Sequence, residues 1–447
     1  MNIVGAGLAG TLLALMLARR GLACNLYERR ADPRTAAPEG GRSINLALAA
    51  RGLRALEHAG VMGHIMPLLI PLRGRLIHDS SGATTLQPYG QRAHEVIYSV
   101  GRAALNRVLL EEVTRYSHVA LRFRHVCLEA APAANRLRFQ DAASGATFAT
   151  VLRPTVATDG AGSTVRASLL AQNYLQTRED WLDHDYKELT LPAIDGAHAL
   201  DPHALHIWPR GGFMLIALPN IDRSFTATLF LARSGTPGFA QLSDGAAVMR
   251  FFREQFPDAV TLIPDLVEQF RMHPAGRLGS VHAAPWHVGG EVLLMGDAAH
   301  AIVPFHGQGM NAAFEDCVEF DLLFERHRDW QSLFLAFEQR RRVHAEAIAQ
   351  MALENYTEMR DSVRDVGFLR RNALALELER HFPDRFIPRY SMVSFHPEIP
   401  YGEALRRGAL QAQILAELDA RTAPGDALDL ALAGRLIDQR LPACGER

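Results

Sequence analysis

The chain has 447 residues, 48% of them apolar, which is enough for two or three domains with substantial cores. Lys and Arg number 47 against 49 Asp and Glu, a net charge of −2, which excludes the strongly basic surface of a nucleic-acid-binding protein. The four cysteines, Cys24, Cys127, Cys317 and Cys444, form no C-x-x-C pair, which argues against a zinc site or a disulfide framework.

The N-terminus has the pattern of a dinucleotide-binding unit. A short apolar run at 2–4 is followed by Gly5, Gly7 and Gly10 at the spacing G-x-G-x-x-G, then by a helical pattern and a second strand that ends in Glu28. In this context the first glycine permits a tight turn. The second lets a pyrophosphate approach the backbone, and the third lets the helix lie close to the strand. A glycine-rich turn without a ligand is the weaker interpretation.

Glu28 lies 18 residues past Gly10 (28 − 10). A carboxylate at this position can accept a hydrogen bond from a ribose hydroxyl, and it disfavours a 2′-phosphate. The pattern therefore predicts FAD or NAD rather than NADP.

The next part of the chain, up to residue 152, is predicted to consist of a loop, short strands and two helices. A polar loop at 29–41 leads into an alternating strand at 42–48 and a helix at 50–59. Arg42 stands where a basic group could meet a phosphate, although a surface arginine at a loop end is an equally good interpretation. Short strands fill 73–152, interrupted by a helix that begins after Arg102.

A second motif begins where the strand at 155–158 runs into Asp159-Gly160. The spacing Asp-Gly-x-x-Ser-x-Val-Arg, from Asp159 to Arg166, resembles the second fingerprint of the FAD-dependent hydroxylases. Asp159 could equally cap the helix that follows. Residues from about 175 to 272 then change character, with strand-like runs separated by turns, which predicts an antiparallel sheet.

A third motif follows a buried strand at 291–295 and begins with Gly296-Asp297. Asp297 is predicted to lie near a ribose or ribityl chain, with a turn or cap role as the weaker alternative. Gly307 and Gly309 would let backbone N–H groups approach a ligand at a helix N-terminus, which suits the electron-rich edge of a reduced flavin. No second complete glycine unit occurs, so one tightly bound dinucleotide is predicted.

The last hundred residues are predicted to be helical. Ile348, Met351, Asn355 and Met359 fall at i, i+3, i+7 and i+11, which places the amide of Asn355 on an apolar face. Such an amide is either a satisfied core group or a ligand contact, and the residues alone favour the core. Tyr390 alone would be interpreted as packing.

Longer blocks of the sequence resemble the kynurenine 3-monooxygenase family, one of the class A flavin-dependent aromatic hydroxylases. The blocks are 41–48 (GRSINLAL), 186–189 (YKEL), 206–209 (HIWP), 216–220 (IALPN), 224–226 (SFT), 351–356 (MALENY) and 385–393 (RFIPRYSMV). The resemblance spans nearly the whole chain.

The resemblance implies FAD as the bound cofactor, NADPH as electron donor and O₂ as oxidant. L-kynurenine would become 3-hydroxykynurenine through a flavin C4a-hydroperoxide, with no metal and no protein nucleophile. The alternatives are a class A hydroxylase of another aromatic acid, a flavoprotein oxidase or dehydrogenase, and a non-catalytic flavin-binding protein.

The resemblance also implies the site residues. Arg75 would pair with the substrate carboxylate through its planar fork. The remaining substrate-binding residues would be Tyr89, Phe305, His306, Gln308, Asn355 and Tyr390, with no acid–base role assigned to His306. The cofactor-binding residues would be Gly5, Gly7, Gly10, Glu28, Arg29, Arg42, Ala47, Arg102, Asp159, Asp297, Gly309, Met310 and Asn311.

We therefore expect an α/β fold with three parts. A Rossmann-type FAD-binding domain would comprise 1–71, 96–175 and 276–340. An inserted antiparallel-sheet substrate domain would comprise 72–95 and 176–275, and a C-terminal helical region 341–447. No apolar run of ~20 residues is found, and the tail at 427–441 is predicted to be an amphipathic surface helix. We expect a cytoplasmic monomer or homodimer without a membrane anchor.

Overall fold

The computed structural model describes residues 1–35, 45–152, 154–362, 366–421 and 428–442. Arg42, with the block 41–44, and Cys444 lie outside the described residues.

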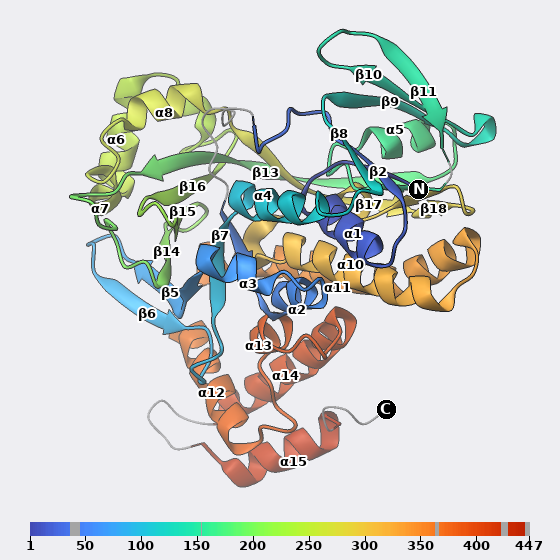
Figure 1. Cartoon of the computed structure of the whole chain (residues 1–447). Coiled ribbons are helices and arrows are strands. Elements are labelled where there is room, and N and C mark those ends of the chain that lie inside the picture. The colour runs from blue at the N-terminus through green and yellow to red at the C-terminus, as the bar shows by residue number, and fades with distance from the viewer. Residues whose placement is uncertain (36–44, 153, 363–365, 422–427, 443–447) are drawn as a thin grey trace.

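A six-stranded sheet forms the centre of the dinucleotide-binding part (Figure 1). Its order is β18 (His287–Val288), β19 (Val292–Leu294), β12 (Thr155–Ala157), β1 (Asn2–Val4), β2 (Cys24–Tyr27) and β8 (Val119–Arg122). All neighbouring strands are parallel except β18 and β19. In the central strand β1, Ile3 pairs with Val156 on one side and Leu26 on the other. Ile3 and Val4 are both buried and apolar, because both faces of the sheet are covered.

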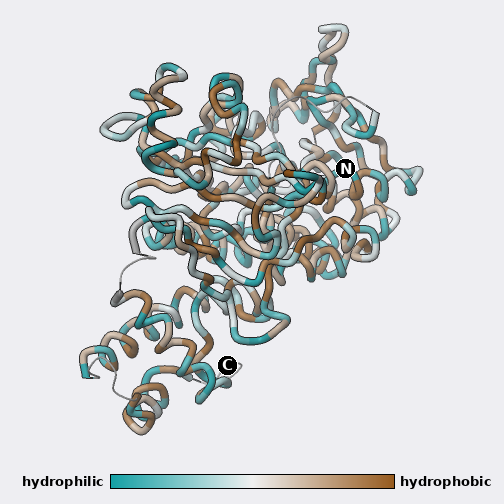
Figure 2. Tube along the Cα trace, turned by 90° about the vertical axis from the view of Figure 1, so that its left-hand side faces the viewer, coloured by the Kyte–Doolittle hydropathy of each residue, from teal (hydrophilic) through white to brown (hydrophobic). Residues whose placement is uncertain are grey.

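The helices of the dinucleotide-binding part pack on this sheet or on one another. They are α1 (Leu8–Arg19), α2 (Ala50–His58), α3 (Met62–Ile65), α4 (Arg102–Val113), α5 (Thr164–Ala171), α9 (Asp297–His300) and α10 (Gly309–Arg326), with the short η1 (Met66–Leu68) and η4 (Pro304–His306). Leucine and alanine fill α1 on every side, and it packs against both α4 and α10. The brown trace inside the molecule in Figure 2 follows this apolar core.

Two three-stranded sheets flank the central one. The first is β11 (Thr147–Val151), β10 (Arg136–Asp141) and β9 (His125–Ala131), an antiparallel meander at the upper right of Figure 1, with η2 (Pro132–Ala134) between β9 and β10. The second is β3 (Asn45–Leu48), β7 (Ile97–Gly101) and β4 (Ile70–Leu72).

A seven-stranded sheet forms the second large layer. Its order is β17 (Gly276–Ala284), β13 (Gln176–Leu191), β16 (Phe225–Ala232), β15 (Met214–Pro219), β14 (Ala204–Pro209), β5 (Gly74–His78) and β6 (Thr84–Pro88). Neighbours are antiparallel except β14 and β5. β17 belongs to this sheet because it pairs with β13, although the expected boundary at 275 placed it with the dinucleotide-binding part.

The two faces of the seven-stranded sheet differ. One is covered by α6 (Gly245–Gln255), α7 (Pro257–Val260), α8 (Leu266–Met272) and η3 (Phe239–Gln241), around a core that includes Trp208 and Phe252. Beneath α8 lies Lys187, the one lysine in the sequence. Its ammonium donates to the carbonyls of Phe270, at 2.7 Å, and His273, and burial lowers its pKa. The opposite face, with Ile77, faces the candidate site.

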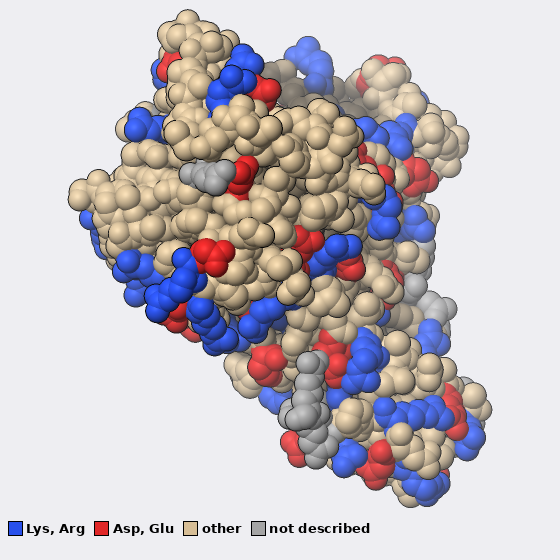
Figure 3. Space-filling view, turned by 90° about the vertical axis from the view of Figure 1, so that its right-hand side faces the viewer, with Lys and Arg blue, Asp and Glu red and all other residues tan. Residues whose placement is uncertain are grey.

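The C-terminal part of the chain is helical, and its last four helices form the lower part of Figure 1. The helical elements are α11 (Trp330–Thr357), the π-helical turn η5 (Glu358–Ser362), α12 (Val366–His381), α13 (Arg389–Ser394), α14 (Tyr401–Arg421) and α15 (Leu430–Arg440). The predicted amphipathic helix of the tail is confirmed as α15, whose buried side packs against α14. Figure 3 shows positive and negative side chains interspersed over this lower part. In the ranges that the structure describes, no helix combines the length and apolar character needed to cross a membrane.

Candidate active site

Four of the predicted cofactor positions meet at one edge of the six-stranded sheet. β1, β2, β12 and β19 run parallel, so their carboxyl ends lie at the same edge. Gly5, Glu28, Asp159 and Asp297 follow these four ends directly or after one or two residues. A dinucleotide binds at this edge in open parallel sheets.

The glycine turn fits a pyrophosphate. Gly5 has a φ of +102°, and a side chain at Gly10 would collide with the carbonyl of Gly5. Where a Cβ of residue 7 would stand, no atom of the described residues outside the adjoining backbone lies within 4 Å. Gly7 is also the N-cap of α1 and supplies no side-chain cap, so the free N–H groups of the first helical turn can meet phosphate oxygens there.

Glu28 braces this turn as well as facing the edge. Its carboxylate accepts hydrogen bonds from the backbone N–H of Ala6 at 3.0 Å and from Nε of Arg30 at 2.8 Å. Burial alone would raise the pKa of Glu28, but Arg30 outweighs it and holds the pKa below its ordinary value. From α4, Asn106 donates to the carbonyl of Ala6 at 3.0 Å. Glu28 therefore stays ionised, and both sides of the turn are fixed.

Asp159 helps to cap the following helix, whose N-cap residue is Ser163. Its carboxylate accepts from the hydroxyl of Ser163 at 2.5 Å and from the N–H of Val165 at 3.2 Å, and burial raises its pKa. The cap, which was one of two open interpretations, is thus present, and contact with the cofactor stays a prediction. Arg166, at the end of the same motif, donates to the carbonyl of Ala298 at 2.9 Å and so joins the second motif to the third.

Three charged residues of the predicted set are exposed. Arg29 follows Glu28, Arg102 is the first residue of α4, and Asp297 is the first residue of α9. None of the three makes a side-chain hydrogen bond or ion pair with another described residue. They stand at the rim of the edge, where they remain predicted contacts for a nucleotide.

Asn311 ties the glycine loop of the third motif to β3. Its amide donates to the carbonyls of Ala47 at 2.9 Å and Gly307 at 2.7 Å, and its carbonyl accepts from the N–H of Ala49 at 2.9 Å. The structure thus brings Ala47, Asn311 and the neighbouring Gly309 and Met310 together. The amide of Asn311 shapes the backbone there and is already satisfied by it.

Arg75 is the centre of the predicted substrate contacts. It lies on β5, 8% exposed, with its guanidinium 5.1 Å from the ring of Tyr390 and 5.9 Å from that of Tyr89. Nη1 donates to Glu358 at 3.2 Å and Nη2 to Asn355 at 3.4 Å. Nε has no hydrogen-bond partner among the described residues.

Three aromatic side chains from distant segments stack beside Arg75. Tyr390 lies between Tyr89 and His306, with ring centroids 5.3 Å apart and planes tilted by 10° in both pairs. Burial lowers the pKa of His306 to about 3, so its imidazole is neutral near pH 7, and burial raises the pKa of Tyr89. The hydroxyl of Tyr89 and Nδ1 of His306 lack hydrogen-bond partners in the described chain. Buried polar atoms of this kind need a partner such as a water molecule, an ion or a ligand.

The apolar wall of the site starts at Phe305. Its ring stacks on Tyr356 at 4.1 Å and packs against Phe230 at 4.9 Å. Asn355 donates to the carbonyl of Phe305 at 2.6 Å while accepting from Arg75, so its amide has partners within the chain, and its contact with a ligand stays a prediction. Gln308 instead turns to α14, where its carbonyl oxygen accepts from the hydroxyl of Tyr401 at 2.8 Å.

Comparison with known proteins agrees with this geometry. Residues 1–352 match the model of the FAD binding domain family. The chain is 45% identical to a kynurenine 3-monooxygenase of Myxococcus xanthus over 442 residues, covering 99% of this chain and 95% of the relative. It is 46% identical to a kynurenine 3-monooxygenase of Stenotrophomonas maltophilia over 433 residues, 96% and 93% of the two chains. The chain belongs to the kynurenine 3-monooxygenase family.

Solved structures place this family member in a wider fold group. A 2-methyl-3-hydroxypyridine-5-carboxylic acid oxygenase superposes with a TM-score of 0.64 at 19% identity, over 81% of this chain and 92% of the other. PqsL of P. aeruginosa, in complex with 2-aminobenzoylacetate, gives a TM-score of 0.65 at 18% identity, over 83% and 98%. At these identities the likeness concerns the fold.

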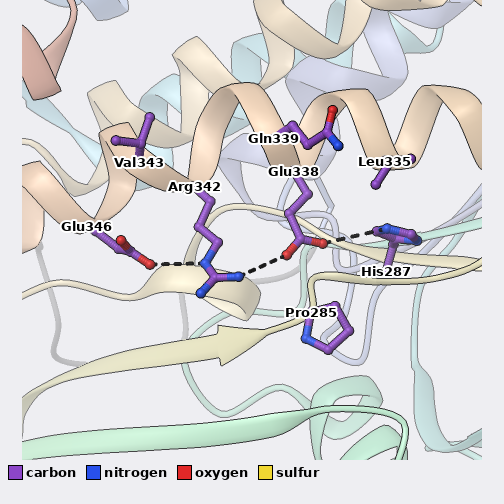
Figure 4. A pocket seen from close by; sticks show the side chains of 8 residues that line it. All are labelled: Pro285, His287, Leu335, Glu338, Gln339, Arg342, Val343 and Glu346. Atoms are coloured by element: carbon purple, nitrogen blue, oxygen red, sulfur yellow. Dashed lines mark hydrogen bonds and ion pairs between the residues drawn. The ribbon is translucent and has the colours of Figure 1, made fainter.

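A surface pocket of about 460 Å³ on α11 is separate from the candidate site (Figure 4). Its charged side chains pair with one another: Arg342 meets Glu346 at 3.0 Å and Glu338 at 3.5 Å, and Glu338 meets His287 at 3.7 Å. None of the predicted site residues lines it.

Sequence reasoning missed five residues at the site. They are Arg30, Asn106, Tyr356, Glu358 and Tyr401. Tyr356 and Glu358 lie within three residues of Asn355, which the helical pattern did single out. Nothing local marks Asn106 or Tyr401, since each acts on a loop that lies far away in the sequence.

Proposed function

We propose that this protein hydroxylates L-kynurenine to 3-hydroxykynurenine, using FAD, NADPH and O₂. Family membership supports the reaction. The observation that supports the substrate is a buried guanidinium, Arg75, with Nε unpartnered among the described residues beside the equally unpartnered hydroxyl of Tyr89. An amino acid carboxylate can accept from both atoms.

The protein's part in the reaction is to hold the substrate in place. When bound, FAD supplies the activation of O₂ and the transfer of one oxygen atom, with electrons from NADPH. Arg75 and Tyr89 anchor the carboxylate, with Tyr390 beside them. The aromatic ring of the substrate then extends toward Phe305 and the loop that bears Gly307 and Gly309, where the flavin is proposed to lie.

The same residues exclude water and charge from the ring. Phe305, Tyr356 and Phe230 form an apolar wall, which would keep water out of the site and so limit the wasteful release of oxygen as hydrogen peroxide. His306 is neutral near pH 7, so it adds no positive charge next to the electron-donating aniline.

The groups at the carboxyl edge of the six-stranded sheet suit FAD. The open side of Gly7 takes the pyrophosphate, the Glu28 carboxylate can accept a ribose hydroxyl, and Asp297 stands free at the rim. Asp159 and Asn311 would act mainly by fixing the turns around it. Action in the cytoplasm, as a monomer or homodimer, and transient docking of NADPH remain predictions.

A hydroxylase of another aromatic acid is the alternative, because a guanidinium flanked by tyrosines recognises carboxylates in general. The test is a mass spectrum of the products from purified FAD-loaded protein, NADPH, air and L-kynurenine. A product about 16 mass units heavier, formed only with NADPH, is expected for insertion of one oxygen atom. Consumption of NADPH with unchanged kynurenine would point to the alternative, and a panel of aromatic acids would then identify the substrate.

A further inference from the structure

Arg75 already forms an ion pair with a carboxylate of the protein, that of Glu358. The binding of a simple acid would not need this second negative charge. Glu358 accepts from Nη1 of Arg75 at 3.2 Å, and the Glu358 side chain is 27% exposed. On the other side, Nε of Arg75 is left for the substrate carboxylate. The proposed ligand therefore has to place its negative charge on a guanidinium that already holds one.

For a ligand whose only charge is a carboxylate, this arrangement is unfavourable. Two carboxylates on neighbouring edges of one guanidinium repel each other, and partial burial weakens the screening by water. An α-amino acid differs, because it carries an ammonium group on the same carbon atom as its carboxylate. Its two charges can be matched by Arg75 and Glu358 together.

We propose that Glu358 binds the α-ammonium group of the substrate and so selects α-amino acids over aromatic acids that lack this group. This role rests on the kynurenine hydroxylation proposed above. On binding, the carboxylate of the substrate takes Nε of Arg75 and the hydroxyl of Tyr89. Its ammonium then forms an ion pair with Glu358, and no proton has to move.

The local backbone explains why Glu358 points to this place. It is the first residue of the π-helical turn η5, which follows directly on α11. Asn355 and Glu358 are three residues apart, and both side chains reach the same guanidinium. Of the described carboxylates, Glu358 alone pairs with Arg75, while Glu354 on the preceding turn pairs with Arg389.

The experiment compares two ligands and two forms of the FAD-loaded protein. The ligands are L-kynurenine and its desamino analogue, 4-(2-aminophenyl)-4-oxobutanoic acid, and their dissociation constants are measured by calorimetry with wild type and Glu358→Gln. We expect wild type to prefer L-kynurenine at least about tenfold, the value of one charge-assisted contact. In Glu358→Gln this preference should disappear, since L-kynurenine loses its partner and the analogue loses the repulsion.

The matched control is Glu346→Gln, on the exposed side of α11 in the surface pocket, which should keep the wild-type preference. Equal affinity of wild type for the two ligands would overturn the proposal even if Glu358→Gln failed to fold. An unchanged preference in Glu358→Gln would do so as well. If wild type neither binds nor hydroxylates L-kynurenine, the proposed function fails first. If it hydroxylates L-kynurenine and the preference is insensitive to Glu358, only this inference fails.

Discussion

The guanidinium of Arg75 is fixed by aromatic rings as much as by polar partners. Two tyrosine rings lie within 6 Å of it: Tyr89 follows β6, the hairpin partner of β5, whereas Tyr390 on α13 is remote in the sequence. Stacking of this kind holds the planar fork in one orientation without occupying all its donors. The arginine therefore meets the ligand already oriented, which reduces the entropy lost on binding.

Replacing Arg75 with alanine should weaken L-kynurenine binding by about 2 kcal/mol, roughly 30-fold, because the carboxylate loses its charged partner. FAD should stay bound, since Arg75 lies on the seven-stranded sheet. Titration of the flavin spectrum with L-kynurenine measures both effects. Arg277→Ala is the control, because Arg277 also stacks on an aromatic ring, that of Trp181 at 4.2 Å, but on the surface. Unchanged affinity in Arg75→Ala would refute the carboxylate role.

At the scale of elements, the loop that carries Phe305 and His306 is held from outside its own domain. Its last residue, Gln308, is the N-cap of α10 and accepts from Tyr401, the first residue of α14. The ring of Tyr401 lies 4.0 Å from the guanidinium of Arg51 on α2. Two helices remote in sequence thus fix the loop on which the flavin and the substrate are proposed to meet.

Tyr401→Phe removes the hydroxyl and keeps the ring, leaving the carbonyl oxygen of Gln308 buried without its donor. We expect a loss of about 1–2 kcal/mol in stability. We also expect more hydrogen peroxide per NADPH consumed, since a looser loop admits water. Thermal unfolding, peroxide assays and hydrogen exchange at 304–310 measure the three effects. Tyr174→Phe, at the half-exposed surface, should change none of them, and equal exchange rates in Tyr401→Phe and wild type would contradict the bracing role.

How much the sequence predicts depends on the distance along the chain. The strand–turn–helix unit around Gly5 was predicted because its signals lie within 28 residues, and the structure confirms each element. The pairing of Arg75 with Glu358 joins residues 283 positions apart, and no local pattern reports it. Asn311 shows a third case. Its motif was recognised, but its amide bonds to the backbone of another strand, which only the tertiary fold brings there.

At the scale of the whole molecule, one buried network joins the dinucleotide-binding part to the C-terminal helices. Arg51 binds Glu315 at 2.7 Å, and Glu315 binds Arg341 at 2.7 Å. Arg341 also pairs with Asp316, which pairs with His300 and whose pKa these partners hold at about 2 against the effect of burial. Arg51 further donates to four backbone carbonyls, those of Met392, Val393, His396 and Ile399.

Arg51→Met keeps most of the side-chain volume and removes these bonds. We expect a loss of about 3 kcal/mol in stability, because four backbone carbonyls lose a donor and Glu315 keeps only Arg341 as its partner. Segment 392–399 should also become accessible to proteases. Denaturant unfolding and limited proteolysis measure the two effects. Arg340→Met serves as the control, since Arg340 forms an exposed pair with Glu319 and should change stability by less than about 0.5 kcal/mol. Equal stability of the two variants would show that the network does not hold the parts together.

Lys187 has a practical consequence for chemical labelling. With one lysine in the whole sequence, and that one buried beneath α8 with its ammonium bound to two carbonyls, amine-directed dyes and cross-linkers have the α-amino group as their main target. Attachment at a single defined point becomes possible without any engineered cysteine. By the same reasoning, modification of Lys187 by such a reagent would report the loosening of α8 from the sheet, and hence the unfolding of the substrate-side domain.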